Sequence, residues 1–110
     1  PVKVRVRTVL EMAYFDHRKI TEETVNANIR PLRSKGANQA LKQTVLCLPP
    51  SDIEDLEKSY ATIQVPTLLI WGNEDKIIPL SLGRRLNQTI SRSQLIVFES
   101  CGHRRRPAKR

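Results

Sequence analysis

Cysteine is scarce in this 110-residue chain, and long apolar runs are missing from it. The two cysteines, Cys47 and Cys101, are too few and too far apart for a disulfide framework or a zinc knuckle, so reduced thiols and a cytoplasmic location are expected. No apolar run approaches the roughly 20 residues that span a bilayer, so no membrane segment is expected. No cluster of His, Cys and carboxylates has the spacing of metal ligands, so neither a metal nor another cofactor is predicted.

Charge of one sign is also missing from the body of the chain, although the net charge is +8. Between residues 8 and 103, eleven basic and eleven acidic residues cancel. The excess lies at the two ends, in Lys3, Arg5, Arg7, Arg104, Arg105, Arg106, Lys109 and Arg110. A nucleic-acid-binding domain is expected to present basic residues on a structured face. Nucleic-acid binding is therefore not predicted, except as a salt-sensitive effect of the basic tail.

The first half of the chain is predicted to be mostly helical. Only at the start do Val2, Val4 and Val6 alternate with basic residues, which is the period of a half-buried strand. The same residues could equally be the frayed start of a segment from a longer chain. Short helices are predicted over 9–15, over 22–30 with Thr21 as N-cap and Pro31 as stop, and over 34–46. Ser51 and Glu54 match a capping box that opens a last helix, ending near residue 60.

The pattern changes to a strand, a helix and a strand after residue 63. The apolar run 65–71, ended by Gly72, is typical of a strand buried on both faces of a parallel sheet. Pro79 is suited to the first turn of a helix whose apolar stripe ends at Ile90, and 94–98 is a second buried-type strand. These features predict an α/β fold with a parallel βαβ unit.

Two polar loops follow the predicted strands, where parallel sheets place functional groups. Asp75 lies in the first loop and His103 ends the second. A carboxylate against the imidazole Nδ1–H fixes the tautomer and leaves Nε2 as a general base. Two plainer interpretations stay open: Asp75 as an ordinary turn residue, and His103 as a surface residue.

Residues 63–103 resemble the C-terminal core of the α/β-hydrolase superfamily. The matching stretch is IQVPTLLIWGNEDKIIPLSLGRRLNQTISRSQLIVFESCGH, with a Val-Pro-Thr strand ending in Trp-Gly, then Asp, Ile-Pro, a helix, a strand and Gly-His. The resemblance implies that Asp75 is the acid and His103 the base of a catalytic triad. It also implies a partial α/β-hydrolase fold, with an N-terminal segment and helical cap-like region in 1–60 and a core segment with a basic tail in 61–110. The substrate implied is an ester, or a carbon–carbon bond beside a ketone, as in the hydrolases of aromatic-ring degradation.

Two parts of the family pattern are missing from these residues. None of the four glycines belongs to a Gly-x-Ser-x-Gly nucleophile elbow, and the oxyanion-hole loop is absent too. The chain is therefore predicted to be the C-terminal part of a serine hydrolase that is inactive alone. The alternative is a truncated, non-catalytic chain that self-associates or binds a partner through uncovered sheet faces.

Five further side chains are candidates for the site or for the core. Cys101, two residues before His103, is interpreted as a packing residue rather than a nucleophile, and Cys47 as a core residue. Tyr14, Phe15 and Trp71 are candidates either for lining a pocket or for the core.

Overall fold

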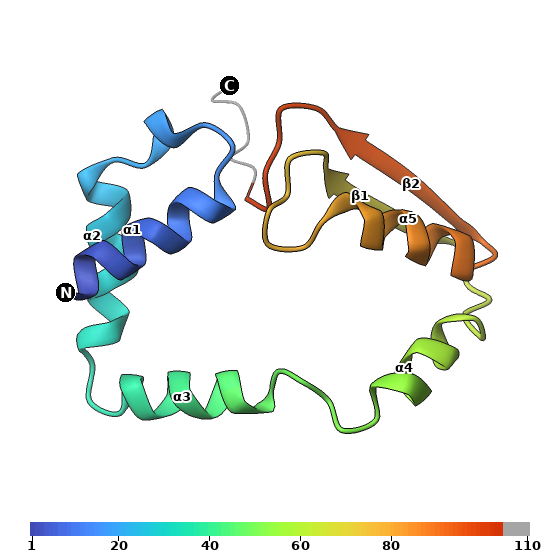
Figure 1. Ribbon diagram of the computed structural model, residues 1–110, viewed down its shortest axis with the longest axis horizontal. Helices are drawn as coiled ribbons and strands as arrows, with labels where there is room; N and C mark the ends of the chain where they lie inside the picture. The colour runs from blue at the N-terminus through green and yellow to red at the C-terminus, as the bar shows by residue number, and fades with distance from the viewer. Residues whose placement is uncertain (105–110) are drawn as a thin grey trace.

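The computed structural model describes residues 1–104, so the predictions on the basic tail beyond Arg104 lie outside the described residues. The elements in chain order are α1 Val2–Ala13, a 3-10 turn η1 His17–Lys19, α2 Glu22–Ile29, a 3-10 turn η2 Arg30–Arg33, α3 Ala37–Cys47, α4 Ile53–Tyr60, β1 Thr67–Gly72, α5 Leu80–Thr89 and β2 Ser93–Phe98. In Figure 1, α1 and α2 form one side of the molecule, and β1, α5 and β2 form the other. No helix in the described part is long and apolar enough to cross a membrane.

The predicted βαβ unit is present. Strands β1 and β2 pair in parallel, from Thr67 opposite Ser93 to Gly72 opposite Phe98. Helix α5 lies between them in the chain and contacts both strands. A parallel two-strand sheet with its crossover helix confirms the α/β fold class.

The prediction that the first strand is buried on both faces is wrong for this structure. Leu68 and Ile70 are 55% and 58% exposed, whereas their neighbours Leu69 and Trp71 are partly buried. Because successive side chains of a strand point to opposite faces, this alternation means that one face of β1 is covered and the other is open.

The prediction of an N-terminal strand is also wrong, because residues 2–13 form α1. Val2 and Val4 are exposed, so their alternation with basic residues serves no sheet. Lys3 and Arg7 lie four positions apart, on one face of the helix, and both form ion pairs with Glu22 of α2, at 2.6 and 2.7 Å. Leu10 is buried in the cluster that α1 forms with α2, and Val6 packs against this cluster, which favours the helix over the strand.

The hydrophobic core of the helical side lies between α1 and α2. Its buried members are Leu10, Ala13, Tyr14, Ile20, Val25 and Ile29. The predicted N-cap is confirmed, since the Thr21 hydroxyl accepts a hydrogen bond from the Thr24 N–H at 3.1 Å. The helix ends at Ile29, and Pro31 follows in η2.

Two local predictions beyond α2 are wrong. Helix α4 begins after Asp52 and has no side-chain cap, so Ser51 and Glu54 do not form the expected capping box. Cys47, expected in the core, is exposed at the end of α3. Both predictions fail for the same reason, which is that α3 and α4 contain no buried residue. Local sequence patterns there are not reinforced by packing.

The loop after β2 connects the two sides of the molecule. The Arg104 N–H donates to the Ala13 carbonyl at 2.8 Å, which joins the loop after β2 to the end of α1 (Figure 1). Gly102 permits this contact, because a Cβ there would lie 2.7 Å from the Ala13 oxygen and 2.9 Å from the Phe15 nitrogen. Both neighbours are backbone atoms, which cannot rotate away.

We predict that Gly102→Ala destabilises the chain by about 2–3 kcal/mol, because the added methyl must push two backbone segments apart. Gly36→Ala is the matched control. Gly36 has φ +82° and no atom within 4 Å of an added Cβ, so this variant bears only the left-handed backbone cost of about 1 kcal/mol. Urea unfolding followed by circular dichroism measures both. Equal losses in the two variants would contradict the tight contact at Gly102.

Candidate active site

Asp75 and His103 lie in loops that follow the carboxyl ends of the two paired strands. Gly72 and Phe98 are partners in the register and each is the last residue of its strand. Asp75 follows the first strand end by three positions, and His103 follows the second by five. The parallel register therefore brings together two residues that are far apart in the sequence.

The two loops are in direct contact. The Asn73 N–H donates to the Phe98 carbonyl at 3.0 Å, and the Glu74 N–H donates to the Cys101 carbonyl at 3.0 Å. Gly72 makes the approach possible, since a Cβ at this position would lie 2.3 Å from the Cys101 oxygen. Any side chain on residue 72 would separate the loops that contain Asp75 and His103.

The two carboxylate oxygens of Asp75 have different partners. Oδ1 accepts hydrogen bonds from the backbone N–H groups of Ile77 at 2.9 Å and Ile78 at 2.8 Å. Oδ2 lies 2.9 Å from Nδ1 of His103. Asp75 is thus a turn residue through one oxygen and a partner of His103 through the other, so its role in the turn does not exclude its contact with the imidazole.

The environment of Asp75 favours its ionised form. Burial of the side chain, which is only 7% exposed, raises the pKa of Asp75. The hydrogen bonds from the Ile78 N–H, from His103 and from the Ile77 N–H lower this pKa. Their combined effect is larger than that of burial, so the pKa of Asp75 lies below its usual range. A carboxylate at neutral pH can only accept, so Nδ1 of a neutral His103 must be the protonated nitrogen. Its Nε2 then has a free lone pair.

The pair lies beside a cavity of about 300 Å³. The His103 side chain is 42% exposed, while its Asp75 partner is nearly buried. The cavity is lined by Ile70, Trp71, Gly72, Asp75, Ile78, Phe98, Cys101, Gly102 and His103. Trp71 therefore lines a pocket, one of the two roles considered for it. An accessible imidazole on a buried carboxylate is suited to exchanging a proton with a group in this cavity.

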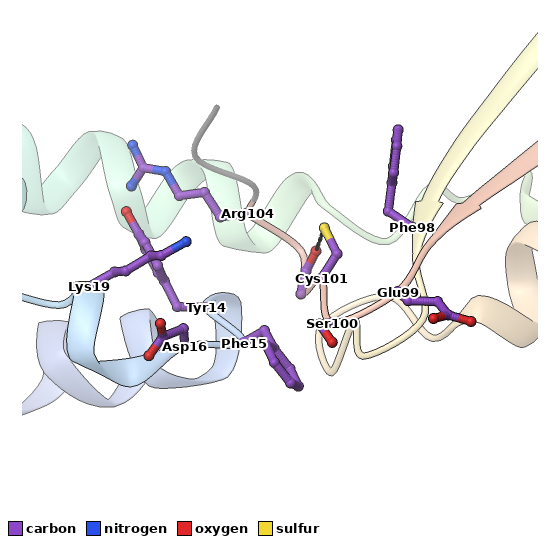
Figure 2. Close-up of a pocket in the computed structure, with 10 residues that line it drawn as sticks. Tyr14, Phe15, Asp16, Lys19, Phe98, Glu99, Ser100, Cys101 and Arg104 are labelled. Carbon is purple, nitrogen blue, oxygen red and sulfur yellow. Dashed lines mark hydrogen bonds between the residues drawn. The ribbon is translucent and has the colours of Figure 1, made fainter. Parts of the chain in front are cut away.

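A second cavity, of about 270 Å³, lies between the end of α1 and the loop after β2 (Figure 2). Tyr14 and Phe15 line it from the helical side, as considered from the sequence, and the segment 98–102 contributes to both cavities. The Arg104 guanidinium lies 5.6 Å from the centre of the Tyr14 ring, a cation–π distance.

Cys101 is buried, and its thiol lies 3.5 Å from the Gly102 carbonyl oxygen. This location agrees with its interpretation as a packing residue. Among the described residues, no group of three or more His, Cys, Asp and Glu side chains could hold a metal ion.

The backbone groups of the site were not predicted from the sequence. The N–H groups of Ile77 and Ile78 fix Asp75, and the indole N–H of Trp71 donates to the Ile78 carbonyl at 2.8 Å. The signal was present, because an Asp followed two and three residues later by non-proline residues can form such a turn. Which oxygen would serve the turn was not predictable from the pattern.

The chain is similar to hydrolases of known activity over nearly its whole length. It is 29% identical over 103 residues to 2-hydroxy-6-oxononadienedioate/2-hydroxy-6-oxononatrienedioate hydrolase 2 of Pseudomonas putida, and 27% identical to the corresponding hydrolase of Klebsiella pneumoniae. Each alignment covers 94% of this chain and 36% of the relative, so the chain spans about a third of the length of these curated relatives.

A solved structure has the same fold over the same region. A mutant of the meta-cleavage product hydrolase from Pseudomonas fluorescens IP01, complexed with acetates, superposes with a TM-score of 0.78 and 27% identity. The match covers 94% of this chain and 39% of that one. The sequence profile of the alpha/beta hydrolase fold matches residues 14–104, most of the chain, including both residues of the candidate site. The chain is a member of the α/β-hydrolase fold family.

Proposed function

We propose that this chain supplies the acid and the base of a serine-hydrolase triad. Asp75 is the acid and His103 the base. The observation on which the proposal depends is the 2.9 Å contact between Asp75 Oδ2 and His103 Nδ1, at the ends of two paired strands. Asp75 fixes the tautomer of the imidazole and stabilises the imidazolium that forms when Nε2 takes up a proton.

The nucleophile of the proposed reaction comes from outside these 110 residues. His103 Nε2 removes the proton of a serine hydroxyl as its oxygen attacks the carbonyl carbon of the substrate, and then donates that proton to the leaving group. Water then hydrolyses the acyl-enzyme with His103 again as the base. Backbone N–H donors for the oxyanion are likewise expected from the segment that holds the serine.

We propose a small ketone substrate cleaved at the carbon–carbon bond beside its carbonyl, with a carboxylic ester as the second choice. The names of the relatives support this choice, since they describe hydrolases of unsaturated 2-hydroxy-6-oxo dicarboxylates. The proposal includes a cytoplasmic location and a division of the chain into a cap-like region, 1–60, and a core segment, 61–110. The confinement of one hydrophobic cluster to residues 10–29 supports the division.

A chimera tests the proposed triad roles. In the Pseudomonas putida relative, the aligned 103-residue segment is replaced by the corresponding segment of this chain. We expect hydrolysis of 2-hydroxy-6-oxononadienedioate by the chimera. Asp75→Asn should lower kcat about 10⁴-fold, because the amide stabilises the wrong tautomer. His103→Ala should remove nearly all turnover.

His17→Ala in the same chimera is the control for histidine loss. Its Nε2 lies 2.9 Å from the Glu11 carbonyl on the helical side, and its side chain does not line the cavity beside Asp75 and His103. Turnover that survives His103→Ala, in a chimera that folds, would contradict the assignment of the base.

The chain by itself should hydrolyse p-nitrophenyl acetate at a rate no higher than its His103→Ala variant. The reason is that the triad nucleophile and the oxyanion donors lie outside it. A rate that depends on His103 would show that a nucleophile lies within these residues. Cys101→Ala would then test the nearest thiol.

Self-association is the second candidate function, and the open face of β1 favours it. Leu68 and Ile70 are more than half exposed, and Ile96 of the paired strand is exposed beside them. A contiguous apolar sheet face is a surface that a second copy can cover.

Sedimentation velocity over a hundredfold concentration range tests this candidate. We expect a monomer–dimer equilibrium that the double change Leu68→Ser and Ile70→Ser shifts to monomer, because it removes the apolar area of the face. The control is Val2→Ser with Val4→Ser, which alters exposed valines of α1. A wild-type chain that stays monomeric throughout would eliminate the candidate.

A further inference from the structure

The loop that positions Asp75 has little packing of its own. Between Gly72 and α5, the residues Asn73, Glu74, Lys76, Ile77, Ile78 and Pro79 are all exposed. Ile77 and Ile78, whose N–H groups bind Asp75, are 40% and 39% exposed. Burial of apolar side chains is only partial in this loop, so its geometry depends strongly on hydrogen bonds.

Two groups of bonds join the loop to the sheet. At its start, the Asn73 N–H donates to Phe98 at the end of β2, and the Glu74 N–H donates to Cys101 in the loop after β2. At its far end, the indole Nε1–H of Trp71 donates to the Ile78 carbonyl at 2.8 Å. Ile78 is thereby bonded on both sides, through its carbonyl to Trp71 and through its N–H to Asp75 Oδ1.

The indole is itself fixed by α5. Gly83 lies under the ring, so that a Cβ there would be 2.7 Å from Cδ2 and 2.8 Å from Cε3 of Trp71. Because the ring packs on the backbone of a regular helix, its N–H has a defined direction. Trp71 therefore connects the position of α5 to the position of Ile78.

We propose that Trp71 is a positioning residue for the Asp75–His103 pair, acting through its indole N–H on Ile78 and so on the orientation of the Asp75 carboxylate. This proposal rests on the proposed function of that pair. The Asp75 carboxylate directs Oδ2 at Nδ1 of His103 while its Oδ1 is bound by the N–H groups of the loop. A shift of Ile78 therefore rotates Oδ2 away from His103. The hydrophobic role of the ring alone does not require a bond at Nε1.

The test removes the N–H and keeps the ring. Trp71 is the single tryptophan of the chain, so growth with β-(3-benzothienyl)alanine replaces it with a ring of the same shape that lacks the donor. Carbon-13 NMR of the side-chain carboxyls then gives the pKa of Asp75. We expect this pKa to rise, because the Ile78 N–H and His103 hydrogen bonds that lower it are both weakened.

Asp16 is the internal control, because Arg18 lowers its pKa and it lies in the turn before η1. Its pKa should stay unchanged. Trp71→Phe, which also removes the donor but retains an aromatic ring, should raise the pKa of Asp75 in the same direction, and it provides the measurement if the analogue does not fold. In the chimera, Trp71→Phe should lower kcat about 10- to 100-fold with little change in KM, as a displaced catalytic pair does.

His103→Ala separates this proposal from the one on which it rests. If His103→Ala raises the pKa of Asp75 and loss of the indole N–H leaves it unchanged, Trp71 is not a positioning residue, although the pair stands. If neither change affects it, the pair itself is not formed and both proposals fail. A rise in both variants, with Asp16 constant, supports both.

Discussion

The candidate site depends on how one carboxylate distributes its hydrogen bonds. Asp75 accepts two backbone N–H groups at Oδ1 and contacts His103 Nδ1 at Oδ2. The backbone bonds fold the loop, and the folded loop directs the second oxygen at the imidazole. Loss of the backbone hydrogen bonds would affect the contact with His103, and the reverse, because the two oxygens belong to one rigid carboxylate. The same bonds offset the cost of burying the charge, which explains how a side chain only 7% exposed remains ionised.

Close backbone contacts at two glycines position the Asp75–His103 pair in the fold. Gly72 allows the loop after β2 to pass against the end of β1, and Gly102 allows the same loop to pass against the end of α1. The segment before His103 thus lies between the sheet and the helical side, with Cys101 and Gly102 buried and His103 exposed. Both cavities of the site border this segment, so their shapes depend on the same two contacts.

Packing is uneven across the described residues. The helical side has a buried cluster between α1 and α2, whereas β1 keeps one apolar face open and α3 and α4 bury no residue. The radius of gyration is 17.0 Å, compared with about 13 Å for a compact domain of this length. Exposed apolar faces follow from this open shape. They are also the surfaces on which any further part of the molecule, or a second copy, would pack.

The sequence by itself determined the elements whose patterns are local. The apolar run before Gly72, the Thr21 cap and the strand 94–98 were predictable because each depends on neighbouring residues. It also predicted that Asp75 and His103 lie close together, since loops at the ends of parallel strands meet at one edge. Only the tertiary structure decided that residues 2–8 belong to the helix predicted from residue 9 onward, because the packing of Leu10 and the ion pairs to Glu22 come from α2. The tertiary structure also decided which oxygen of Asp75 contacts His103. That choice depends on where the backbone N–H groups of the loop lie, and the order of side chains in the sequence does not specify this geometry.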